Sequence, residues 1–142
     1  MTRVTMQLDG EAQLMAALRA YGEKADRHVG DAINATGLEL RGDIVKAYQR
    51  GPATGRTYEK YNPRRTHRAS AKGEAPATDT GRLASSVNYR REGALSASVG
   101  SEIVYASILE FSGDRPAWVP AVEAMRPKYI ERLERALERA AR

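Results

Sequence analysis

Hydrophobic positions in the first 50 residues recur with two different periods. Apolar and polar residues alternate over residues 3–8, which predicts a short, half-buried strand. From Asp9 the spacing changes to three and four, which predicts a helix that is capped by Asp9 and ends at about Asp26. The apolar stripe of this helix consists of Leu14, Leu18, Tyr21 and Ala25.

A second helix is predicted from about Arg27 to Arg50. Its apolar face again follows spacings of three and four. The positions on this face are Val29, Ile33, Gly37, Leu40, Ile44 and Tyr48. A glycine in mid-helix is costly, so Gly37 suggests the close approach of another backbone. The Gly51-Pro52 pair ends the helix, because a residue that precedes proline disfavours helical geometry.

A central hairpin is the clearest strand signal in the chain. Val87 and Tyr89 alternate with polar residues, Glu92-Gly93 supplies the turn, and a second alternating run ends at Gly100. One helical turn is predicted just before it, from Leu83 to Ser86, with Asp79 or Thr80 as its cap. A two-stranded hairpin is marginal alone, so this one needs the N-terminal strand, a helix or a neighbouring subunit.

Two more helices complete the predicted fold. Residues 103–111 have a short, uneven apolar face, and residues 119–141 carry a regular apolar stripe. The sequence therefore predicts a single α+β domain over residues 1–142. Its small antiparallel sheet, built from the N-terminal strand and the central hairpin, is expected to pack with two N-terminal helices, a short helix and a long C-terminal helix.

Residues 51–79 show no convincing period and are predicted to form a long basic loop or arm. From Arg50 to Lys72, seven basic residues stand against Glu59 alone, whereas the whole chain has a net charge of +5. The candidate contact residues of the arm are Arg56, Lys60, Arg64, Arg65, Arg68 and Lys72. Two interpretations stay open: an arm that orders against a neighbouring subunit or an acidic partner, and a direct contact with nucleic acid.

Composition and motifs give no sign of a reaction. The chain has no cysteine, which excludes disulfides and thiolate metal sites. It has neither a signal-peptide pattern nor a run of about 20 apolar residues, so we expect no membrane partner. His28 and His67 lack a second histidine at metal-binding spacing, and no nucleophile motif or phosphate-binding loop occurs. We therefore expect no enzymatic activity, no cofactor and no metal.

Three short motifs occur in order after the arm. The first contains Pro76, Thr80, Gly81, Leu83, Ser86 and Val87. The second contains Tyr105, Ala106, Glu110 and Phe111, and the third contains Pro116, Trp118, Pro120 and Ala121. In this order they resemble the small neck proteins of long-tailed double-stranded DNA phages, also called head–tail joining or tail-completion proteins. The chain departs from that pattern by one extra residue after Pro76, by Ser112-Gly113 in place of Gly-Thr, and by Trp118 in place of a phenylalanine.

The resemblance implies a structural role in the virion neck. During assembly the protein would be in the host cytoplasm. Six or twelve copies would form a ring between a head-side connector or stopper protein and a tail-terminator or tail tube protein, with phage DNA in the lumen. The residues implied in subunit or partner contacts are Thr80, Gly81, Leu83, Ser86, Tyr105, Glu110, Phe111, Trp118 and Pro120. Alternatives are an adjacent tail-terminator or head-closure role and a freestanding nucleic-acid-binding module. On residue chemistry alone, Glu110 is a surface acid, a cap or an inter-subunit partner for an arginine.

Overall fold

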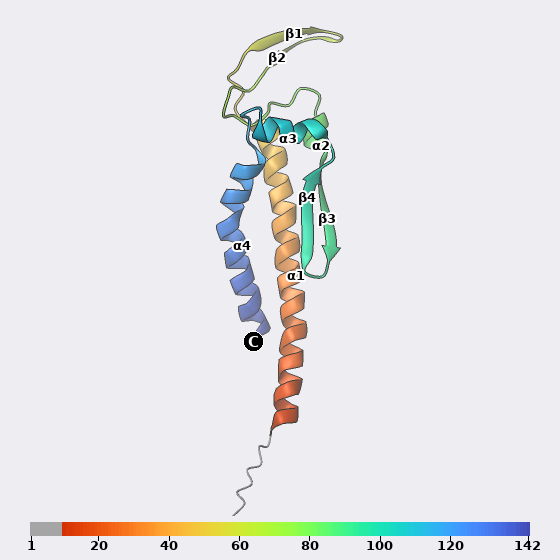
Figure 1. Cartoon of the computed structure of the whole chain (residues 1–142), viewed down its shortest axis with the longest axis vertical. Helices are drawn as coiled ribbons and strands as arrows, with labels where there is room; N and C mark the ends of the chain where they lie inside the picture. Colours follow the sequence, from red (N-terminus) through yellow and green to blue (C-terminus); the bar gives the residue numbers. More distant parts are fainter. Residues whose placement is uncertain (1–9) are drawn as a thin grey trace, which may run out of the picture.

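One long helix forms the axis of the molecule. The computed structural model describes residues 10–142, so the strand predicted over residues 3–8 lies outside the described residues. Helix α1 spans Glu11–Arg50 without interruption (Figure 1). The prediction of two helices that meet near Asp26 is therefore wrong. The roughly 1 kcal/mol cost of Gly22 does not break the helix, and no proline stands in it.

The two apolar stripes that predicted two helices belong to two faces of α1. His28, Ala32 and Ala35 line the side toward helix α4, which spans Trp118–Ala140. Ile33 and Leu40 line a groove to which both α4 and strand β4, which spans Ser96–Ser101, contribute. The first stripe is exposed from Leu14 to Tyr21, whereas the second packs against α4 and β4, so the change of stripe marks the point where α1 enters the packed part of the molecule.

The remaining elements gather around the C-terminal half of α1 (Figure 1). Strand β3 (Val87–Gly93) pairs with β4 as an antiparallel hairpin along one side of α1, and α4 lies along the other. The short helices α2 (Arg82–Ser85) and α3 (Val104–Phe111) lie at the end of α1 where its C-terminus is. This arrangement leaves the N-terminal half of α1 extending alone.

The hydrophobic core is concentrated at the end of α1 that α2 and α3 cover. Its buried residues are Ile44, Tyr48, Ala84, Val87 and Ala117. The indole nitrogen of Trp118 donates a hydrogen bond of 2.6 Å to the hydroxyl of Tyr48, which links α4 to α1. Desolvation by burial raises the pKa of Tyr48. The two ring systems therefore pack as core residues while their polar atoms satisfy each other.

Glycines on α1 make room for the β3–β4 hairpin. A Cβ at Gly37 would lie 2.5 Å from the ring of Tyr89, so the close neighbour of Gly37 is a side chain and not the backbone that the sequence suggested. The close backbone approach occurs two helical turns earlier, at Gly30, where a Cβ would lie 2.6 Å from the carbonyl oxygen of Ala94. The hairpin thus contacts α1 at its tip as well as in the core.

Residues 51–79 contain regular structure that the sequence did not predict. Strands β1 (Thr57–Tyr61) and β2 (Arg64–Arg68) form an antiparallel hairpin that projects beyond the end of α1 (Figure 1). The fold class, α+β, is confirmed. The sheet arrangement differs from the prediction, because the described residues form two separate two-stranded sheets. Between residues 10 and 142, no helix is both long and apolar enough to cross a membrane.

Candidate assembly surface

One carboxylate, that of Asp79, holds both strands of the β1–β2 hairpin to the segment that precedes α2. Asp79 forms ion pairs with Lys60 of β1 and Arg65 of β2, and the distance from Arg65 Nη2 to Asp79 Oδ1 is 2.9 Å. Arg65 also donates a hydrogen bond of 3.0 Å to the backbone carbonyl of Asp79, and His67 Nδ1 lies 3.9 Å from Oδ1. The hydrogen bond from Lys60, with the charge of Arg65, lowers the pKa of Asp79. Asp79 therefore anchors the arm, and of the two predicted caps of α2 only Thr80 contacts its first turn, where the hydroxyl accepts a hydrogen bond of 3.4 Å from the amide of Arg82.

Pairing inside the chain divides the six basic residues of the arm into two sets. Lys60 and Arg65 share one partner, Asp79, and Lys72 Nζ lies 2.9 Å from Asp114 Oδ2. The other three, Arg56, Arg64 and Arg68, are exposed and make no ion pair within residues 10–142. Arg56 lies over the ring of Tyr58, 5.4 Å from its centroid. Only half of the predicted basic cluster is thus left for an external anion.

Two further polar contacts fix the loops at the base of the hairpin. Glu74 accepts hydrogen bonds from the backbone amides of Thr54 (3.0 Å) and Ala71 (2.8 Å). Hydrogen bonds from Thr54 and Ala71 lower the pKa of Glu74. Arg115 donates to the hydroxyl of Ser70 at 3.0 Å and to its carbonyl at 3.3 Å. These bonds join the arm to the loop that leads into α4.

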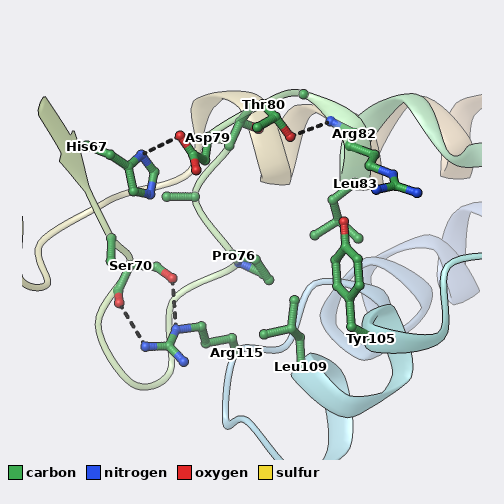
Figure 2. Close-up of a pocket in the computed structure, with 14 residues that line it drawn as sticks. His67, Ser70, Pro76, Asp79, Thr80, Arg82, Leu83, Tyr105, Leu109 and Arg115 are labelled. Carbon is green, nitrogen blue, oxygen red and sulfur yellow. Dashed lines mark hydrogen bonds and ion pairs between the residues drawn. The ribbon is translucent and has the colours of Figure 1, made fainter. Parts of the chain in front are cut away.

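Four of the predicted contact residues line one pocket (Figure 2). They are Thr80, Gly81, Leu83 and Tyr105. The pocket measures about 300 Å³ and lies between the segment that precedes α2 and helix α3, with Pro76 and Leu109 on its apolar side. Gly81 has a φ of 76°, a left-handed conformation that glycine adopts without strain. This glycine redirects the chain from the arm anchor at Asp79 into α2.

Glu110 caps the N-terminus of α4. Its Oε2 accepts hydrogen bonds from the amides of Ala117 (2.7 Å) and Trp118 (3.0 Å), and its Oε1 accepts one from Val119 (2.8 Å). The first amides of a helix lack partners inside the helix, and a carboxylate also complements the positive end of the helix dipole. Both oxygens of the buried Glu110 are thus used within the chain, and no arginine of the described residues pairs with it.

Helix α3 presents an uncovered apolar face next to these residues. Val104, Ile108 and Phe111 lie at spacings of four and three, and their exposed fractions are 79%, 54% and 75%. We call these three residues the α3 face. Phe111 also lines a second pocket of about 500 Å³, together with Glu110 and Trp118. Val104 and Ile108 were not among the contact residues predicted from the sequence, although both belong to the uneven apolar pattern of residues 103–111.

The remaining predicted residues do not line the pocket of Tyr105. Ser86 donates a hydrogen bond of 2.6 Å to the carbonyl of Leu83, and its hydroxyl lies 2.7 Å from that of Ser101. Pro120 is exposed in the first turn of α4. Within residues 10–142, no group of three or more His, Asp or Glu side chains is placed to hold a metal ion. No protein-family model matches the chain, and comparisons with curated proteins and with solved structures give no match.

Proposed function

We propose that the chain is a structural protein of a phage neck, which assembles as a ring between the head-side connector and the tail. The observation that carries this proposal is the meeting of the three motifs at one end of the molecule. Thr80, Gly81 and Tyr105 share a pocket, while Glu110 and Trp118 join α3 to α4 beside it. The three motifs, which are far apart in the sequence, therefore contribute to the same end of the molecule.

Two features of this end suit contacts between subunits. A closed ring needs two different faces that fit each other, because its contacts run head to tail. The α3 face offers exposed apolar area, and the β1–β2 hairpin extends away from the body with free strand edges. An exposed strand edge can add to a strand of another chain, and an apolar cluster can anchor a partner. We propose that the hairpin of one copy contacts the α3 end of the next.

The test of the ring is made in the phage that encodes the chain. Phe111→Glu places a charge in the α3 face, and we expect a folded chain that fails to join heads to tails. Ile130→Glu is the matched control, because Ile130 is 50% exposed on α4, away from this end. Electron microscopy counts joined particles, and circular dichroism verifies folding. Normal joining with Phe111→Glu, or location of a tagged chain only in the capsid shell or tail tip, would refute the proposal.

The basic arm supports a second role, contact with DNA. Arg56, Arg64 and Arg68 are exposed and form no ion pair within the described residues, so their charges can meet phosphates, while Arg68 also donates to the carbonyls of Gly55 and Thr54. Three phosphate contacts predict that log K falls with log salt concentration with a slope of about −3, whereas all six basic residues would give about −5. Fluorescence anisotropy on duplex DNA measures this slope. Absence of binding at low salt would leave the arm as a protein contact only.

A further inference from the structure

An apolar groove of about 330 Å³ lies between β4 and α4 and is bounded by α1. Val122 of α4 lines this groove and is still 41% exposed, so the groove is open to solvent. The apolar and aromatic lining comes from all three elements and includes Ile33, Leu40, Ala97, Val99, Val122 and Tyr129. Within residues 10–142 no segment fills the groove, although most of its lining is apolar.

The edge of β4 beside this groove has no strand partner within residues 10–142. Strand β4 pairs only with β3, along its other edge. The groove is lined by Ala97 and Val99 of β4 and by no residue of β3, so β4 is the strand of the hairpin nearer to α4. An unpaired edge can add a further strand. Because Ser96 and Ser98 of β4 are exposed, an added strand needs apolar side chains toward the groove and polar ones toward solvent.

Residues 3–8 have the pattern and the length that such a strand needs. Val4, Met6 and Leu8 alternate with the polar Thr5 and Gln7. Strand β4 has 6 residues, Ser96–Ser101, and the predicted strand has as many. In a strand every second side chain points to the same face, so the three apolar side chains would all enter the groove.

The groove of the same chain is out of reach for residues 3–8. Helix α1 runs without interruption from Glu11, and the first of its residues to line the groove is Ile33. From Glu11 to Ile33 the helix rises about 33 Å at 1.5 Å per residue. The extended chain from Leu8 to Glu11 spans at most about 11 Å. A strand formed by residues 3–8 in this groove must therefore come from another copy of the chain.

We infer that residues 3–8 of one copy add as a strand to the free edge of β4 in a second copy, with Val4, Met6 and Leu8 in the groove between β4 and α4. Main-chain hydrogen bonds to β4 supply affinity, and the apolar side chains fix which face of the added strand turns inward. An orientation antiparallel to β4 places Leu8 at the tip of the β3–β4 hairpin, away from α2 and α3 (Figure 1). The N-terminal half of the donor's α1, which extends alone, then continues away from the acceptor.

This contact does not rest on the neck ring proposed above, although it is compatible with it. The donor segment and the acceptor groove are different parts of the chain, so the contact runs head to tail, as the contacts of a ring do. Phe111, which tests the ring, does not line this groove. Phe111→Glu should therefore leave the present contact intact, and either proposal can fail while the other stands.

Sedimentation equilibrium of the full chain tests the contribution of the donor segment. We expect wild-type protein to associate reversibly, with a Kd in the micromolar range. Met6→Glu places a charge at the central inward position and should raise the Kd about 100-fold. Gln7→Glu adds the same charge one residue later, on the outward face, and should associate like the wild type. Wild-type protein that stays monomeric up to millimolar concentration, or equal association of the two variants, would overturn the inference.

A mixture of two defective variants tests the donor and the acceptor separately. Val122→Glu charges the groove and leaves the segment intact, whereas Met6→Glu does the reverse, so neither should associate alone where the wild type does. An equimolar mixture should associate, because Val122→Glu protein donates its segment to the intact groove of Met6→Glu protein. Ala124→Glu, exposed on α4 but outside the groove, is the control for Val122→Glu, and circular dichroism verifies folding. A mixture that associates no better than its folded components would overturn the inference.

Discussion

The two β-hairpins have the same local structure but different attachments to the molecule. The β3–β4 hairpin lies along α1, where Val87 is buried in the core and Tyr89 packs on Gly37. The β1–β2 hairpin projects past the end of α1, and the side chain of Asp79 holds it. Burial contributes about 25 cal/mol for each Å² of apolar surface, whereas exposed ion pairs contribute little. The first hairpin is thus part of the folding unit, and the second can detach while the core stays folded.

The largest loss of stability is expected from substitution of Glu110, the buried carboxylate that caps α4. Glu110→Ala removes the acceptor of three amides at the start of α4, and we expect a loss of about 3 kcal/mol in the free energy of unfolding. Glu110→Gln keeps one carbonyl acceptor and should lose less. Denaturant titrations measure both. Glu123, an exposed acid on α4, is the control. If Glu110→Ala lowers the free energy of unfolding by less than Glu123→Ala does, burial does not make the Glu110 contacts stronger.

Two glycines of α1 test whether packing holds the β3–β4 hairpin. Gly30→Ala places a Cβ 2.6 Å from the carbonyl oxygen of Ala94, so the tip of the hairpin must move, at a cost of about 1–3 kcal/mol. Gly42→Ala meets no atom within 4 Å and should stabilise the helix by up to about 1 kcal/mol. Thermal unfolding compares them. Equal shifts in the same direction would mean that the tip does not pack on α1 in solution.

The sequence predicted those elements whose apolar period is set by a single neighbour. The β3–β4 hairpin and α4 follow such patterns, and the α+β class was predicted as well. Helix α3 was predicted from a short apolar run, although most of its apolar face is exposed. The continuity of α1 was missed because its exposed N-terminal part and its packed C-terminal part carry different apolar stripes. The β1–β2 hairpin was missed because its side chains are almost all polar: across the pair, Lys60 faces Arg65 and Glu59 faces Thr66. A strand whose side chains are mostly polar shows no apolar alternation, so the sequence pattern does not predict it.

The candidate surface was predictable in its residues but not in their roles. Thr80, Gly81 and Tyr105 were singled out in the sequence, yet only the fold brings them to one pocket. Asp79 looked like a helix cap, because capping needs only local sequence, whereas its partners Lys60 and Arg65 are 14 and more residues away. Contacts between segments so distant in sequence depend on tertiary structure, which local patterns do not encode.

Detaching the β1–β2 hairpin should have little effect on overall stability. Asp79→Ala leaves Lys60 and Arg65 without their shared partner, and the hairpin should loosen while the unfolding temperature stays close to that of the wild type. Trypsin measures the loosening, because it cuts after Lys and Arg, and we expect several-fold faster cleavage at Arg64 and Arg65. Asp114→Ala, which frees only Lys72, is the control. Unchanged cleavage with Asp79→Ala would mean that something other than Asp79 holds the arm.

Acid should release the same hairpin by a smaller and reversible step. The pKa of Asp79 is lowered from its ordinary value of 3.8, so the anchor is complete above that pH and is lost as the pH falls through the lowered value. The pKa of Glu39 is also lowered, and its protonation weakens the contact between α1 and α4; the pKa of Glu74 is lowered as well, and its protonation loosens the loops at the base of the arm. Hydrogen-exchange protection factors of β1–β2 amides, compared with those of β3–β4, separate the local step from the global one. In Asp79→Ala the excess acid sensitivity of β1–β2 should disappear; if it persists, protonation of Asp79 is not what releases the arm.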